Sequence, residues 1–287
     1  MKSKTLTIVA LVLLMAMCSC EKPMIPDVGV EGNLEVRIAT IEQVDFPAFA
    51  TRATLEDVCT RLNFLVYDSL GNRVAYDNQT SDQKGFGTAD FQLSPGKYQV
   101  VVVAQSSQGN PTSTKSNKIQ FTKATGFSDT FYSNNYVVVS DDAVTVDAKL
   151  SRNVSLCRVQ FNDTIPQNIS KMRFEYSGGS GSFDAATGLG VKTTTKQEMT
   201  FAVEAGSDSA VFDLYTFLPE DAESIHLKAE AYASDNKLVC SREFDIPMKP
   251  RQITKFSGSF FSGSSGSSIT IIIGINTDWD GEQEVNF

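Results

Sequence analysis

Apolar and polar residues alternate along most of this sequence with a period of two, beginning at residue 34. In the stretch LEVRIAT (34–40), the first, third and fifth residues are apolar and the second and fourth are charged. This alternation places one face of a β-strand against a core and the other face in water. No stretch after residue 34 keeps a helical period, although residues 52–60 have room for one short turn. We therefore predict an all-β chain.

Turn sequences divide the alternating stretches into short segments of strand length. The expected strands are 34–40, 61–68, 73–76, 88–93, 98–105, 136–139, 143–150, 154–161, 171–177, 199–205, 209–217, 225–233, 237–244 and 253–261. Short strands at this spacing are typical of β-sandwiches and barrels, and a length of 287 residues accommodates two such domains. We place the boundary near residue 150, which gives an N-terminal β-sandwich over 34–150 and a C-terminal one over 151–287.

The N-terminal end follows a different pattern. Lysines at positions 2 and 4 precede an uncharged run over residues 6–17. A membrane-spanning helix needs about 20 apolar residues, and a shorter run behind a positive start is typical of a secretory signal peptide. The run ends at cysteine, which is the mark of a bacterial lipoprotein signal. Such signals place a small residue before the lipidated cysteine: Ser19 precedes Cys20, whereas the bulky Met17 precedes Cys18.

We therefore predict that residues 1–19 are a signal peptide and that Cys20 carries the lipid. A diacyl thioether together with an N-acyl chain exceeds the two hydrophobic signals that stable membrane anchoring needs. Residues 20–33 contain prolines and glycines and show little periodicity. We expect this stretch to tether the lipid to the folded part of the chain.

The C-terminal end also departs from the general pattern. A Gly/Ser tract at 257–268 is typical of a flexible linker. It precedes ITIIIGI, in which one face of the expected strand carries four isoleucines, Ile269, Ile271, Ile273 and Ile275. The stretch DWDGEQE (278–284) resembles part of a calcium loop but lacks the complete ligand pattern. We expect a solvated acidic segment there and no metal site.

Charge and cysteine content narrow the possible classes of protein. The formal net charge of −9 does not suit nucleic-acid binding, which is driven by neutralising phosphates. Beyond Cys20 there are three cysteines, Cys59, Cys157 and Cys240, and an odd number defines no full disulfide framework. Cys157 and Cys240 both lie in expected strands of the second half, so a disulfide bond between them is one possibility. The alternative is three buried thiols that pack as small apolar side chains.

Few residues offer catalytic or ligand-binding chemistry. His226 is the single histidine, and it alternates onto the polar face of its expected strand with Lys228 and Glu230, so we expect it to be exposed. A catalytic histidine needs a nucleophile and an orienting partner close by. The glycine-rich stretch 177–183 lacks the Gly-Lys-Ser/Thr of a phosphate loop. We therefore expect no enzymatic activity, no cofactor and no metal.

Four features in a fixed order carry a resemblance to a known family. They are CSC at 18–20, ATRAT at 50–54, the pair RLNFLVYDSLGNRV and LSPGKYQVVVVAQ at 61–74 and 93–105, and LSRNVSLCRVQF at 150–161. With these features the chain resembles the fimbrillins and their lipoprotein anchor subunits, which are adhesin components of the fimbriae of Gram-negative anaerobes. The resemblance covers nearly the whole mature chain, and it depends on the order of the motifs more than on any one of them.

The resemblance implies two tandem transthyretin-like β-sandwich domains with Greek-key topology, and no enzymatic activity. Members of the family polymerise or cap a filament by strand exchange, in which a strand of one subunit fills an open groove in the next. In polymerising members a trypsin-like protease cuts after an arginine and releases the first strand, and Arg52 and Ala53 match that position. Anchor members keep both the lipid and the first strand.

Two functions remain open. The first is a lipid-anchored fimbrial subunit or fimbrial anchor in the outer membrane, which contributes to adhesion and has other fimbrial subunits as partners. If Arg52 is cut, the isoleucine-rich stretch 269–275 is the candidate donor strand; otherwise it is the last strand of the second domain, paired within the chain. The alternative function is a stand-alone surface lipoprotein whose sandwich binds a glycan or a protein partner. An exposed aromatic platform on a loop would support this alternative, and an exchangeable strand would support the first.

Overall fold

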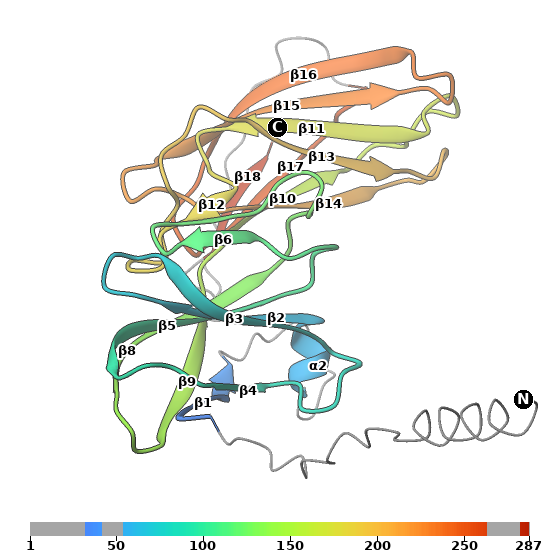
Figure 1. Ribbon diagram of the computed structural model, residues 1–287. Helices are drawn as coiled ribbons and strands as arrows, with labels where there is room; N and C mark the ends of the chain where they lie inside the picture. The colour runs from blue at the N-terminus through green and yellow to red at the C-terminus, as the bar shows by residue number, and fades with distance from the viewer. Residues whose placement is uncertain (1–31, 42–53, 263–281, 287) are drawn as a thin grey trace, which may run out of the picture. The chain divides into compact units, whose positions relative to one another are not determined.

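The structure, a computed structural model, describes residues 32–41, 54–262 and 282–286. Within these ranges nearly all regular structure is β-strand, which confirms the all-β prediction (Figure 1). One four-residue helix, α2 (Leu55–Val58), lies in the stretch where the sequence has room for a short turn. No helix among the described residues is long and apolar enough to cross a membrane.

The first half of the chain forms a seven-stranded sheet in the order β3-β2-β5-β8-β9-β1-β4. Its strands are β1 (Leu34–Ile41), β2 (Arg61–Tyr67), β3 (Arg73–Thr80), β4 (Thr88–Phe91), β5 (Gly96–Gln105), β8 (Thr130–Val139) and β9 (Val144–Arg152). β1 runs parallel to β9, and the other neighbours are antiparallel. β8 and β9 pair over only two residue pairs, so the sheet can fold there and close over one core.

Side chains from both parts of this sheet fill that core. β2, β5 and β8 contribute Phe64, Val102 and Phe131, and β1 and β9 contribute Val36 and Ala148. All five are at most 1% exposed. β5 is apolar on both faces because it lies between β2 and β8 with its second face turned to another apolar cluster. The expectation of a central strand at 98–105 is therefore confirmed.

A small three-stranded sheet connects the two halves of the chain. It consists of β6 (Thr112–Lys115), β7 (Lys118–Gln120) and β12 (Ser182–Phe183), in the order β12-β7-β6. These short, polar strands show no alternation of apolar and polar residues and were not predicted. Around them Leu65 and Val101 of the first half pack in one cluster with Leu156, Phe183 and Phe217 of the second. This shared cluster joins the two halves by apolar contact.

A turn after β12 depends on one glycine. Gly188 has a φ of +73°, and a Cβ placed there would lie 2.3 Å from the hydroxyl oxygen of Tyr132. The Gly188 N–H donates to the carbonyl oxygen of Asp184 at 2.7 Å. Only glycine combines this left-handed conformation with so close an approach.

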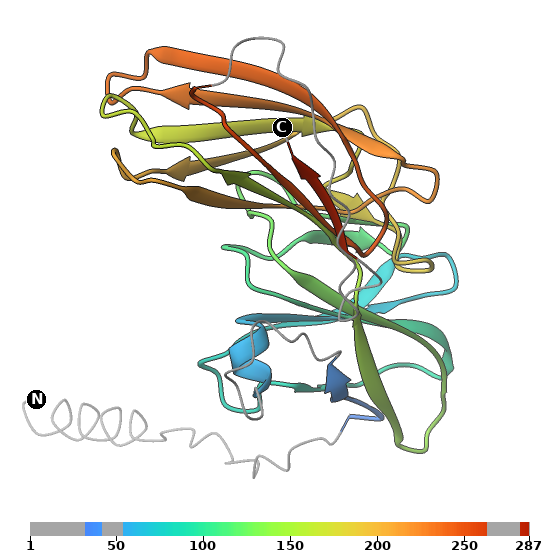
Figure 2. The same ribbon diagram turned by 180° about the vertical axis from the view of Figure 1, so that it is seen from behind.

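The second half forms two four-stranded sheets. One contains β10 (Ser155–Phe161), β14 (Ala210–Thr216), β17 (Ile253–Gly258) and β18 (Glu282–Asn286), in the order β14-β10-β17-β18. The other contains β11 (Lys171–Ser177), β13 (Gln197–Ala202), β15 (Ser224–Tyr232) and β16 (Leu238–Pro247), in the order β13-β11-β15-β16. Both sheets contribute to one buried aromatic core, which makes this half a β-sandwich (Figure 2).

The predicted boundary near residue 150 falls inside β9, because β9 continues to Arg152 and β10 begins at Ser155. The described residues, from 32 onward, fall in one compact unit. The division into domains 34–150 and 151–287 therefore stays a prediction.

The acidic stretch expected as a solvated segment, 278–284, overlaps a strand over residues 282–286, and its solvation stays a prediction. These residues form β18, which pairs in parallel with β17 at the edge of its sheet. The backbone supplies the pairing, so the acidic composition of the stretch does not prevent it.

Candidate functional site

The first strand, β1, is held on both of its edges. It pairs antiparallel with β4 and parallel with β9, and Leu34 and Val36 are fully buried. At its N-terminal end the side-chain amide of Asn33 donates to the carbonyl oxygens of Leu93 and Ser140 at 2.8 and 3.1 Å, and accepts from Leu93 N–H at 2.8 Å. β1 is thus part of the core and not a loose extension.

The proposed processing residues, Arg52 and Ala53, lie outside the described residues, in the connection between β1 and α2. Thr54 follows directly and caps α2. Its backbone N–H and its hydroxyl both donate hydrogen bonds to Asp57 Oδ2, at 2.8 and 3.0 Å. Everything N-terminal to a cut at Arg52, including β1, would lose its covalent link to the rest of the fold.

The other predicted site residues, Cys20 and the four isoleucines between 269 and 275, also lie outside the described residues. The last described residues before the isoleucines, 260–262, are held against the C-terminal sandwich. Asp163 accepts the backbone N–H groups of Phe260, Phe261 and Ser262 at 3.0, 2.6 and 2.8 Å. Burial alone would raise the pKa of Asp163, but these hydrogen bonds lower it below its usual value.

The ring of Phe260 stacks on Phe161 with centroids 4.5 Å apart. Asp163 and this stack hold the segment just beyond β17 in place. The flexible-linker prediction for 257–268 is therefore wrong for its first residues, because 257 and 258 belong to β17 and the backbone of 260–262 is held by Asp163.

The three cysteines among the described residues carry free thiols. Cys157 and Cys240 do not pair, so the thiol alternative is the one that the structure shows. Cys59 and Cys157 are buried and Cys240 is half-buried. Burial raises the pKa of Cys59 to about 12 and raises that of Cys157 as well, which makes both unreactive.

His226 is exposed, as the alternation predicts. Its side chain is 49% exposed, and Nδ1 lies 2.8 Å from Asp245 Oδ1. Among the described residues no three His, Cys, Asp or Glu side chains gather as metal ligands would.

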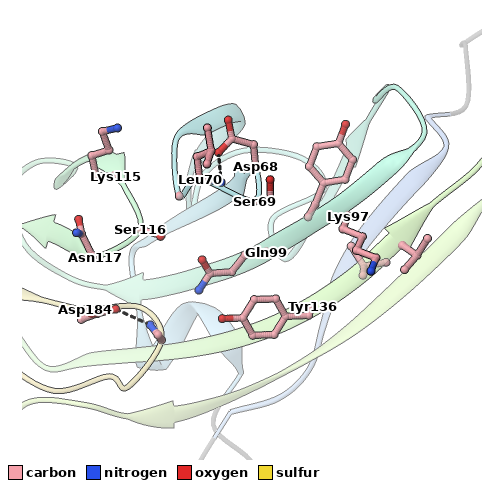
Figure 3. A pocket seen from close by; sticks show the side chains of 15 residues that line it. Asp68, Ser69, Leu70, Lys97, Gln99, Lys115, Ser116, Asn117, Tyr136 and Asp184 are labelled. Atoms are coloured by element: carbon pink, nitrogen blue, oxygen red, sulfur yellow. Dashed lines mark hydrogen bonds between the residues drawn. The ribbon is translucent and has the colours of Figure 1, made fainter.

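An open cleft of about 930 Å³ lies over the outer face of β5 and β8 (Figure 3). Its floor is formed by Lys97 and Gln99 of β5 and by Tyr136 and Val138 of β8. Gln99 pairs with Tyr136 across the two strands, and Lys97 pairs with Val138. Tyr136 and Val138 are 74% and 64% exposed, so two large side chains with apolar surface lie side by side in contact with water.

Three turns form the walls of this cleft. They are the β2–β3 turn at 68–71, the β6–β7 turn at 115–117, and the loop containing Asp184. Asp184 N–H and Oδ1 are used within its own loop, and Ser116 carbonyl accepts Ala185 N–H at 2.9 Å. The walls are therefore fixed by hydrogen bonds.

The cleft was not predicted from the sequence. Its one local signal was that the stretch YVVV (136–139) is apolar at every position, which leaves apolar side chains on the face turned away from the core. The walls come from segments far apart in the chain, and no local pattern brings them together.

Comparison with known proteins identifies the family. The description of the matching family is "Fimbrillin-A associated anchor proteins Mfa1 and Mfa2", and the match spans residues 32–284. The chain belongs to this family. The resemblance noted from the motifs is thereby confirmed, and the family description names anchor proteins that are associated with fimbrillin. No curated protein matches the sequence.

The chain is also similar to two solved structures, at low identity and low TM-score. The fimbrial anchor protein Mfa2 from Porphyromonas gingivalis is 11% identical, with a TM-score of 0.38 over 73% of this chain and 80% of that one. A fimbrial assembly protein from Parabacteroides distasonis is 12% identical, with a TM-score of 0.43 over 88% of this chain and 97% of that one.

Proposed function

We propose that this protein is a lipid-anchored fimbrial subunit or fimbrial anchor, attached to the outer membrane through Cys20 and assembled with other fimbrial subunits by strand exchange. Membership of the fimbrial anchor family supports a fimbrial or adhesin role at the cell surface. The single observation that carries the finer proposal is that the same chain joins a lipoprotein signal to the family's folded region, residues 32–284.

The energetics of β1 support exchange. Burying Leu34 and Val36 is worth about 1.5–3 kcal/mol for each side chain. Ordering a strand costs about 1–2 kcal/mol per residue. The hydrogen-bond ladders on both edges and the contacts of Asn33 must offset the remainder. The favourable and unfavourable contributions to β1 pairing are thus of similar size. We expect β1 to stay in its sheet while the chain after it is intact, and to become exchangeable once the peptide bond after Arg52 is cut.

A cut at Arg52 would also separate the lipid from the fold, because Cys20 and β1 both precede it. The cut protein would then stay on the membrane only as long as β1 stays paired with β4 and β9. A member that serves as the anchor must therefore remain uncut or keep β1 in its sheet.

Limited trypsin treatment of the purified mature protein tests the exchange. The cut is confirmed by a new N-terminus at Ala53, and Arg52→Gln serves as the uncut control. If strand exchange operates, clipped protein forms oligomers that Ile271→Asp with Ile273→Asp prevents without lowering the melting temperature. Clipped wild-type protein that stays monomeric, or aspartates that unfold the C-terminal sandwich, would overturn the exchange.

Metabolic labelling with an alkyne fatty acid tests the anchor. Cys20→Ala is expected to lose the label and to leave the membrane fraction, whereas Cys18→Ala keeps both. Loss of label in Cys18→Ala alone would show that the wrong cysteine has been assigned.

A further inference from the structure

We propose that the cleft over β5 and β8 binds a short neutral oligosaccharide, with one sugar ring stacked on Tyr136. This inference goes beyond the fimbrial function and does not rest on it. The cleft comprises a fixed floor, three walls and an exposed aromatic ring (Figure 3).

The floor offers an apolar strip for the ring face of a sugar. Tyr136 and Val138 project from the same face of β8, two residues apart and therefore about 7 Å apart along the strand. Both are largely exposed, so a ligand that covers them removes apolar surface from water. In Figure 3 the hydroxyl of Tyr136 is directed toward the side of the cleft where Asn117 and Asp184 lie.

Polar groups around this strip can both donate and accept hydrogen bonds. The Gln99 amide is oriented by its donation to Asn134 Oδ1 at 2.9 Å, and its carbonyl oxygen accepts no hydrogen bond from the described residues. Asn117 makes no side-chain hydrogen bond within the described ranges, and Asp184 has Oδ2 free beside its bonded Oδ1. Amides and carboxylates of this kind suit adjacent sugar hydroxyls, which also donate and accept.

The charges favour a neutral ligand. Two lysines, Lys97 and Lys115, and two aspartates, Asp68 and Asp184, line the cleft, so their formal charges cancel. Asp68 is further occupied by the backbone N–H groups of its own turn, at 2.9 and 2.8 Å. For a polyanionic ligand, repulsion from the two carboxylates would offset attraction to the two ammonium groups. The cleft therefore lacks the net positive charge that favours such ligands.

The backbone of the floor argues against an extended peptide lying across it. β5 is paired with β8 from Gly96 to Gln105 and with β2 from Gln99 to Gln105. The N–H and C=O groups of β5 are therefore largely unavailable for strand addition, and a ligand that lies over β5 is recognised mainly by side chains. The cleft volume of about 930 Å³ lies near the upper end of the range for ligand pockets, roughly 300–1,000 Å³, and holds a short oligosaccharide.

Saturation-transfer NMR and calorimetric titration of the full mature chain in detergent test the proposal. The probes are maltotriose, cellotriose, laminaritriose and xylotriose, with trigalacturonate as the acidic comparison. We expect at least one neutral trisaccharide to bind, Tyr136→Ala to weaken binding by about tenfold or more, and Tyr136→Phe to stay within about threefold because the ring face remains.

Tyr76→Ala is the matched control, since Tyr76 is also exposed, at 56%, but lies on β3 outside the cleft. It should leave binding unchanged, and thermal melts should show that all variants fold. The proposal fails if no neutral trisaccharide binds, if Tyr136→Ala binds as well as wild type, or if only the acidic sugar binds. It also fails if the cleft proves to hold a peptide instead. None of these results bears on fimbrial assembly.

Discussion

Replacing Arg173 with methionine measures how strongly one network of charged side chains, Arg173 with its three glutamate partners, stabilises the C-terminal sandwich. Arg173 lies on the outer face of β11 and donates to Glu230 Oε2 and Glu198 Oε2, both at 2.7 Å, and to Glu175 Oε2 at 3.1 Å. Methionine keeps the length and packing of the side chain and removes the charge. Three carboxylates on neighbouring strands then face one another without their shared cation.

The expected loss of stability is about 2–3 kcal/mol. A hydrogen bond to a charged group contributes roughly 1.5–3 kcal/mol, and Glu230 is only 4% exposed, so its carboxylate cannot be rehydrated fully. Two effects reduce the sum of three such bonds. The Arg173 side chain is 27% exposed, which screens its charge, and Lys228 still reaches Glu230 at 2.9 Å.

The loss should depend on pH in a defined direction. Hydrogen bonding to Arg173 is the main cause that lowers the pKa of Glu198 from 4.5 to about 2. Burial opposes ionisation of Glu230, but hydrogen bonds from Lys228, Arg173 and Tyr232 lower its pKa from 4.5 to about 2 as well. A carboxylate with a lowered pKa in the folded state stabilises the fold above pH 4.5 and loses that contribution as the pH falls toward 2.

Urea unfolding of wild type and Arg173→Met at pH 7, 4 and 2.5, followed by circular dichroism, measures the effect. The difference in unfolding free energy should be full at pH 7 and should shrink by more than half at pH 2.5. Arg37→Met is the control, because the Arg37–Asp147 pair is about half exposed on both sides, and solvent screening should make its loss much less destabilising. Equal losses in the two variants, or a difference that does not shrink in acid, would refute the reasoning.

Three further predictions follow from local geometry. Asp163→Ala should cost about 1–2 kcal/mol and speed hydrogen exchange of the three amides just beyond β17, as measured by NMR; unchanged exchange would contradict the contacts seen there. Gly188→Ala should lower stability by about 2 kcal/mol or more, and Gly85→Ala by about 1, because both have positive φ but only Gly188 meets a neighbouring side chain; equal melting temperatures would contradict this. Iodoacetamide on native, lipidated protein should alkylate Cys240 well before Cys157, detected by mass spectrometry, since only Cys157 is fully buried.

The alternation in the sequence was enough to place most strands and the all-β class. A strand that buries one face repeats every second residue, whatever its partners are, so a stretch such as 171–177, in which buried and half-buried residues alternate, can be predicted without knowing its neighbours. The same rule marked 98–105 as a strand covered on both faces, which its place between β2 and β8 confirms. The exposure of His226 followed from the same alternation.

Pairing, in contrast, was decided by the tertiary structure. β6, β7 and β12 are too short and too polar to show a period, and they exist because the ladder hydrogen bonds between 112–120 and 182–183 satisfy backbone groups in a shared apolar cluster. β18 is acidic, yet its backbone completes an edge of the sheet beside β17. The cleft also depends on tertiary structure. Its walls come together around Tyr136 only once the strands have paired, because they are formed by the turns at 68–71 and 115–117 and by the loop at Asp184. Periodicity records which face of a strand is buried, whereas the contacts between distant segments depend on register and packing that no local stretch contains.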